Sequence, residues 1–143
     1  MRLGREAVAR AVGDLRARGH EIAGCGILLS SGRPLTTLEA TLASHALIHT
    51  AEGELFRQAL ARAGEACGLA VRGVKEREVF ERGAVELGMP AAELQQRVAE
   101  LGRRLGPPWR QDEKLAALVA WLVLRAGVAD PVEWVQRSPR NRR

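Results

Sequence analysis

Residues 20–32, HEIAGCGILLSSG, set the expected architecture of this chain. The apolar run at 22–29 is short and bounded by glycine, which is typical of a buried β-strand. Gly24 and Gly26 alternate in it, as glycines do where another backbone or a ligand comes close. A second short apolar segment, LAVRGVKE at 69–76, predicts another strand. We therefore expect a small, mostly parallel sheet in a helix-dominated α/β fold.

Apolar residues at helical spacing surround the two predicted strands. The spacing predicts helices over 5–19, 37–67, 76–88, 91–105 and from 111 onward, with a short last helix around Val132, Trp134 and Val135. Thr36 and Glu39 form a capping box that places one helix start near Thr37. We expect a single α/β domain over 1–136, packed by helices, and a basic, disordered tail over 137–143.

Chain length, cysteine spacing and the longest apolar run limit the classes of protein to which this chain can belong. A chain of 143 residues is long enough to bury a core without disulfides. Cys25 and Cys67 lack metal-binding spacing, so we expect two buried, reduced thiols. The most apolar run, LAALVAWLVL at 115–124, is too short to span a membrane and predicts a buried core helix. The charged N-terminus lacks the features of a signal peptide, which predicts a cytoplasmic protein without a membrane partner.

The charge favours an anionic partner. The formal net charge is +5, which suits nucleic acid or a phosphorylated ligand, although the arginine-rich tail accounts for part of it. The chain has no Tyr and two Phe, so stacking on bases is not its obvious binding mode.

The predicted helix over 37–67 carries an unusual cluster. On a helical wheel, one sector holds His45, His49 and Glu52 together with apolar residues, namely Leu38, Leu42, Phe56, Leu60 and Ala63. The opposite side is a solvated face that holds Glu39, Thr50, Glu54 and Arg57. The pattern therefore predicts that the three ionisable side chains interrupt the core-facing stripe. Because burying unpaired charges is costly, they require partners or a pocket.

The spacing of the cluster allows three interpretations. His-x3-His lets two imidazoles share a zinc ion, and Glu52 could supply a third ligand or act as a general base. The same residues could line a catalytic or ligand-binding pocket without a metal. They could also form a structural hydrogen-bonded network. Gly53 beside them would allow a neighbouring backbone or substrate to approach.

Two further segments hold candidate residues. In GPPWRQDEK at 106–114, Trp109 is expected to be an anchor, and Asp112 is either a helix N-cap or a carboxylate for a divalent cation. Lys75 follows the second predicted strand, where open α/β sheets bind ligands, but 75–78 could equally begin a solvated helix.

Two resemblances add expectations. The runs GRPLTTLEATLASHALIHTAEGELFRQAL and GPPWRQDEKLAAL resemble a family of bacterial proteins, with the signature SHxxIHTAEGELFR, to which no function is attached. From Glu52 onward the order of elements is also similar to the ribonuclease H-like fold of Holliday-junction resolvases. That resemblance implies that Glu52, Lys75 and Asp112 help to bind magnesium and DNA. The first strand, IAGCGILLSS, lacks the aspartate that such nucleases need, so the resemblance bears on the fold more than on activity.

Two functional hypotheses follow. The first is a metal-dependent hydrolase or nuclease-like protein acting on nucleic acid or a phosphorylated substrate. It would use a divalent metal (zinc or magnesium) on His45, His49 and Glu52, catalysis by Glu52, His49 and Asp112, and substrate binding by Lys75, Arg57 and Trp109. The second is a non-catalytic helical binding module or homodimer in which the cluster is a structural polar network.

Overall fold

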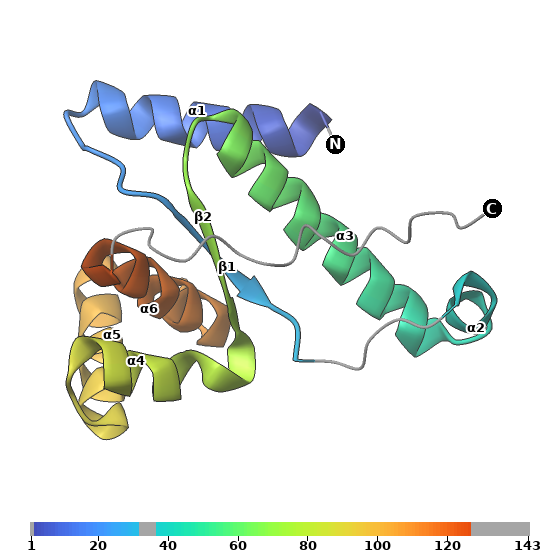
Figure 1. Ribbon diagram of the computed structural model, residues 1–143. Helices are drawn as coiled ribbons and strands as arrows, with labels where there is room; N and C mark the ends of the chain where they lie inside the picture. Colours follow the sequence, from blue (N-terminus) through green and yellow to red (C-terminus); the bar gives the residue numbers. More distant parts are fainter. Residues whose placement is uncertain (1, 32–36, 127–143) are drawn as a thin grey trace.

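A two-stranded parallel sheet lies at the centre of the structure, a computed structural model that describes residues 2–31 and 37–126 (Figure 1). Strand β1 (Cys25–Leu29) pairs with β2 (Val71–Lys75), with Cys25 opposite Val71 and Leu29 opposite Lys75. Both strands fall inside the segments predicted from the sequence. The predicted helix-dominated α/β fold with a small parallel sheet is therefore confirmed.

Helices make up most of the described chain. They are α1 (Arg2–Ala17), α2 (Leu38–Leu42), α3 (His45–Ala66), α4 (Val79–Leu87), α5 (Ala91–Leu105) and α6 (Gln111–Ala126), with a 3-10 turn η1 (Glu76–Glu78) before α4. The tail and the last predicted helix lie outside the described residues. Among those residues, no helix combines the length and apolar character needed to cross a membrane.

The predicted single helix over 37–67 is wrong in one respect, because it is divided into α2 and α3. Helix α2 ends at Leu42 and α3 begins at His45, with Ser44 in an extended conformation as the N-cap of α3. The first cap is Thr37, whose hydroxyl oxygen accepts a hydrogen bond from the Ala40 N–H at 3.1 Å. The predicted capping residue, Thr36, lies outside the described residues.

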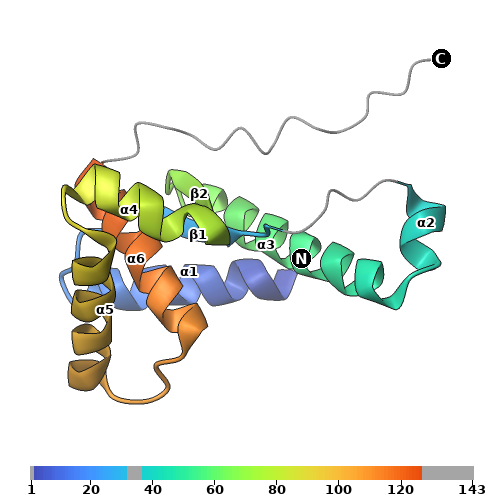
Figure 2. The ribbon, with the colours of Figure 1, turned by 90° about the horizontal axis from the view of Figure 1, so that it is seen from below.

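The two faces of the sheet are covered by different helices. Because side chains alternate along a strand, Ile27 and Val71 pack with Ala61 of α3, whereas Val74 packs in a larger cluster. The buried members of that cluster are Val74, Val79, Leu94, Val98, Leu115, Leu118, Val119 and Leu122. Figures 1 and 2 show α3 and α1 on one side of the strands and α4, α5 and α6 on the other. The predicted core helix over 115–124 is confirmed as part of α6.

Gly26 allows α6 to lie close against β1. A Cβ atom at Gly26 would lie 2.7 Å from Cγ1 of Val119 and 3.3 Å from its backbone. The close approach predicted for this glycine is therefore confirmed, and its cause is a helix backbone rather than a ligand.

Cys25 predicts a pH dependence of folding. Both cysteines are free, as predicted, but each is only partly buried, whereas the sequence predicted buried thiols. Burial, and secondarily the charge of Cys67, raise the pKa of the Cys25 thiol above its ordinary value of 9.0. The unfolded chain then loses this proton at lower pH than the folded chain. Stability from the protonated thiol is thus full below pH 9.0 and is lost as the pH rises towards the folded pKa.

We expect the free energy of unfolding to fall more steeply above pH 9.0 in the wild type than in Cys25→Ala. Urea denaturation of both chains at several alkaline pH values measures the slope of the unfolding free energy against pH. The contributions of other titrating groups are nearly the same in both chains and largely cancel in the difference. Parallel pH profiles for the two chains would contradict the prediction.

Candidate functional site

His45, His49 and Glu52 form one hydrogen-bonded row along the first turns of α3. His49 Nδ1 lies 3.0 Å from a Glu52 carboxylate oxygen, and His49 Nε2 lies 3.0 Å from His45 Nε2. The two imidazole rings meet edge to face, with centroids 4.4 Å apart. The i, i+4 and i, i+7 spacing on one helix therefore brings the three predicted residues together, as expected.

The hydrogen bonds fix the proton positions when both rings are neutral. A carboxylate can only accept, so His49 donates its Nδ1–H to Glu52 and its Nε2 becomes an acceptor. His45 must then donate its Nε2–H to His49. The row thus runs from His45 through His49 to the carboxylate, with each ring holding the next in place.

The triad is exposed, which corrects the prediction that it interrupts a buried stripe. The side chains of His49 and Glu52 are 63% and 58% exposed. Of the apolar residues predicted to face the core with them, only Ala63 is buried. Leu38, Leu42, Phe56 and Leu60 are all exposed. On the opposite side of α3, Thr50, Glu54 and Arg57 are only partly exposed, so the face predicted to be solvated is more covered than the face that carries the triad.

The length of α3 explains this error. A helix of 22 residues is about 33 Å long, whereas a strand of five residues covers only about 17 Å. The C-terminal half of α3 packs on both strands through small residues, with Gly64 against Cys25 of β1 and Val71 of β2. The N-terminal half projects past the sheet towards α2 (Figure 1). Phe56 therefore meets no layer of the same chain among the described residues and stays exposed, whereas Leu47 and Ile48, on another side of the helix, are partly buried.

The structure does not bring the other predicted catalytic and binding residues to the triad. Asp112 lies in the first turn of α6, on the other side of the sheet from α3 (Figures 1 and 2). The carboxylate that caps this helix is Glu113, which accepts a hydrogen bond from the Arg110 N–H at 2.7 Å, so the predicted N-cap role of Asp112 is wrong. Lys75 ends β2 and forms an ion pair with Glu78 at 3.6 Å.

Arg57 and Trp109 have local packing roles. The Arg57 side chain bends back over Gly53, where a Cβ would lie 3.0 Å from its Nη1 atom. The close neighbour of Gly53 is thus a side chain of the same helix. Trp109 lies against Gly102 of α5 and donates its indole N–H to the Val98 carbonyl at 3.0 Å. This is the anchor that the sequence predicts.

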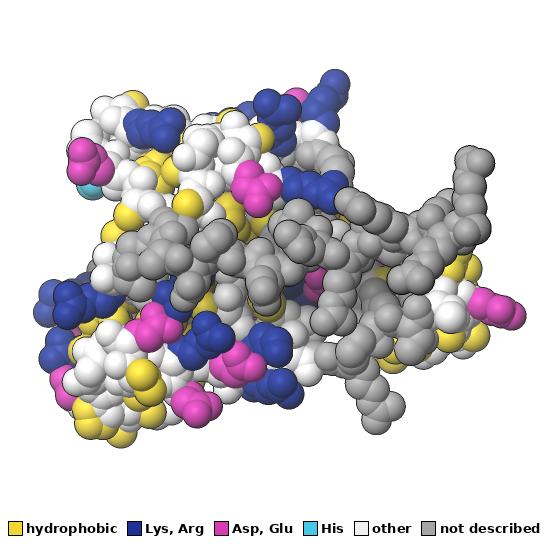
Figure 3. Space-filling model, in the orientation of Figure 1, with side chains coloured by type: hydrophobic (Ala, Val, Ile, Leu, Met, Phe, Trp, Pro, Cys, Tyr) yellow, Lys and Arg dark blue, Asp and Glu magenta, His cyan; other side chains and the backbone are white. Residues whose placement is uncertain are grey.

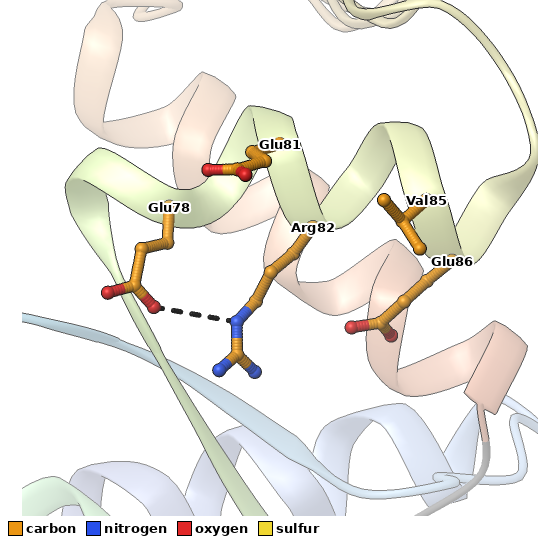
Figure 4. Close-up of a pocket in the computed structure, with 5 residues that line it drawn as sticks. All are labelled: Glu78, Glu81, Arg82, Val85 and Glu86. Atoms are coloured by element: carbon orange, nitrogen blue, oxygen red, sulfur yellow. Dashed lines mark ion pairs between the residues drawn. The ribbon is translucent and has the colours of Figure 1, made fainter.

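A hollow of about 480 Å³ along α4 also gathers ionisable groups (Figure 4). It is lined by Glu78, Glu81, Arg82, Val85 and Glu86. Glu78 forms ion pairs with Lys75, Arg77 and Arg82, and Glu86 pairs with Arg72. Most of its charge is therefore neutralised within the chain.

The pair of Arg72 and Glu86 was not predicted from the sequence. Arg72 is 6% exposed, and its guanidinium lies 2.5 Å from the Glu86 carboxylate. The burial of Arg72 could have been predicted from its position in a short strand next to Val71, because every second residue of such a strand faces a layer of helices.

Two results bear on function beyond this geometry. Within residues 2–31 and 37–126, no group of three or more His, Cys, Asp and Glu side chains is arranged to hold a metal ion. Comparison of the chain with protein-family models, with curated proteins and with solved structures finds no match.

Proposed function

We propose that this protein is a non-catalytic binding module that forms a homodimer through the projecting half of α3 and the adjoining α2. The contact surface, here called the α2–α3 stripe, consists of Leu38, Leu42, His45, His49, Glu52, Phe56 and Leu60. The observation that supports it is apolar exposure: Leu38 is 75% exposed, Leu42 64%, Phe56 70% and Leu60 44%. Exposed apolar side chains grouped in this way mark contact surfaces. Figure 3 shows hydrophobic side chains at the α2 end of the molecule.

The size of the surface suits a second protein chain. The four exposed apolar side chains of the stripe supply part of the area of about 800 Å² that each partner buries in a standard interface. The polar triad, at the centre of the stripe, supplies the remaining area.

The position of the triad suits a second copy of the same chain. In α3, Phe56 and Leu60 follow the triad at helical spacing, and α2, which carries Leu38 and Leu42, adjoins the other end of the triad. We place a two-fold axis near His49 with the α3 helices antiparallel, so that Phe56 and Leu60 of one copy face α2 of the other. The same axis sets the histidines of one copy beside Glu52 of the other. The contact is then made by the same surface of both copies, as a two-fold interface requires.

The hydrolase interpretation has less support. It requires Asp112 and Lys75 to act at the same place as the triad, and both lie on other elements, α6 and β2. A contact with a second chain, by contrast, accounts for the exposed apolar side chains on both sides of the triad.

Phe56→Lys is expected to weaken the dimer about 100-fold or more, because each dimer loses two aromatic contacts and gains two charges. Sedimentation equilibrium of the full chain in EDTA measures the dissociation constant. The fold should be unaffected, since Phe56 is 70% exposed, and far-UV circular dichroism checks this.

Val85→Lys is the matched control. Val85 is 78% exposed, but it lies on α4, on the other side of the sheet. We expect this variant to dimerise like the wild type. A wild-type chain that stays monomeric in EDTA, or a Val85→Lys variant weakened as much as Phe56→Lys, would overturn the proposed function.

A further inference from the structure

We infer that His45 and His49 of two copies together bind one divalent transition-metal ion at the centre of the dimer. This inference rests on the proposed function and names the ligand class of the same surface. It follows from the geometry of the two imidazoles, the position of Glu52 and the number of ligands in one chain.

The two imidazoles present the same ring atom to each other at a distance close to that of a chelate. Their Nε2 atoms are 3.0 Å apart. Two nitrogens bound to one tetrahedral zinc ion at about 2.05 Å lie roughly 3.4 Å from each other. Conversion of the hydrogen bond into a chelate therefore needs a small separation of the two nitrogens and a rotation of both exposed rings, so that their lone pairs point at the ion.

Glu52 orients His49 as carboxylates orient metal-binding histidines. It accepts the Nδ1–H of His49 at 3.0 Å, which places the lone pair of this ring on Nε2, the atom that accepts from His45 in the absence of metal and that would bind the cation in its place. On metal binding, the hydrogen at His45 Nε2 moves to Nδ1 of the same ring, so both neutral imidazoles become ligands and no proton is lost overall.

One chain supplies only half of such a site. Zinc in structural sites takes four ligands, and imidazole is a good ligand for it. Within the described part of the chain, no third His, Cys, Asp or Glu completes a metal-binding group. A two-fold axis near His49 brings the same pair from the second copy to the same place. The site is therefore complete only in the dimer.

Zinc titration of the metal-free full chain tests this inference. We expect Zn²⁺ to tighten the dimer about 100-fold when present well above its dissociation constant, with one ion bound per two chains. Mg²⁺ should have no such effect, because it prefers oxygen ligands. Sedimentation equilibrium and metal analysis of the isolated dimer give the two quantities, and Co²⁺ absorption reports whether the coordination is tetrahedral.

Variants distinguish zinc binding at His45 and His49 from zinc binding elsewhere on the chain. His45→Ala and His49→Ala should both lose the response to zinc, whereas His20→Ala, outside the stripe, should keep it. Glu52→Gln should bind zinc about 10- to 100-fold more weakly while remaining a dimer.

The outcomes distinguish the two proposals. A dimer in EDTA that does not respond to zinc, or a His49→Ala variant that responds like the wild type, overturns the metal site and leaves the dimer. One zinc per chain without tighter association overturns it too. A chain that is monomeric in EDTA but dimerises with zinc through His45 and His49 overturns the apolar dimer and supports the metal site.

Discussion

Replacing Gly102 by alanine is expected to lower the free energy of unfolding by roughly 3 kcal/mol, as overpacking in a tight core does. A Cβ atom at this position would overlap the indole ring of Trp109, with Cδ1, Cγ and Nε1 as its nearest neighbours. The ring cannot retreat freely, because its N–H is held by the Val98 carbonyl at 3.0 Å. The variant must therefore move Trp109 and break this bond, which loosens α5 from the segment that leads into α6. Urea denaturation followed by circular dichroism measures the loss.

Gly13→Ala is the matched control. Gly13 lies in the middle of α1, and a Cβ there would meet no atom within 4 Å. The same substitution should therefore raise the free energy of unfolding by about 0.5 to 1 kcal/mol through helix propensity alone. If Gly102→Ala were as stable as Gly13→Ala, the contact between α5 and Trp109 would not exist in solution.

Periodicity in the sequence predicted most of the fold. The strands at 25–29 and 71–75 were identifiable because short apolar runs bounded by glycine have few other structures open to them. The break between α2 and α3 was not predicted. Ala43 and Ser44 are compatible with a helix interior, and neither glycine nor proline marks the interruption.

The candidate site was predicted in its members but not in its surroundings. Local spacing placed His45, His49 and Glu52 together, because residues on successive turns of one helix are neighbours whatever the rest of the fold does. Whether that face is buried depends on which layer lies over it. A helical wheel shows that Phe56 and His49 lie on the same side of the helix. It cannot show that α3 extends beyond the ends of the strands on which it packs. An apolar stripe on a helix has the same sequence pattern whether it packs in the core of its own chain or contacts another chain.

The second large expected loss of stability concerns Arg72, a charged residue that is buried in the structure. Arg72 is 6% exposed, and its guanidinium contacts Glu86 and, at 3.4 Å, the Leu122 carbonyl. We expect Glu86→Ala to cost about 3 kcal/mol of unfolding free energy, because it leaves a buried cation without its carboxylate. Denaturant titration at neutral pH measures this. Glu93→Ala breaks the exposed pair with Arg97 and should cost less than about 1 kcal/mol.

The double variant Arg72→Met with Glu86→Leu separates the value of the pair from the cost of breaking it. Both charges are then gone and the volume is nearly conserved, so stability should return to within about 1 kcal/mol of the wild type or exceed it. Such a recovery would mean that the pair contributes little net stability and that the loss in Glu86→Ala is a desolvation penalty on Arg72. If the double variant were instead less stable than Glu86→Ala, the ion pair itself would hold α4 against β2 and α6, and the desolvation argument would be wrong.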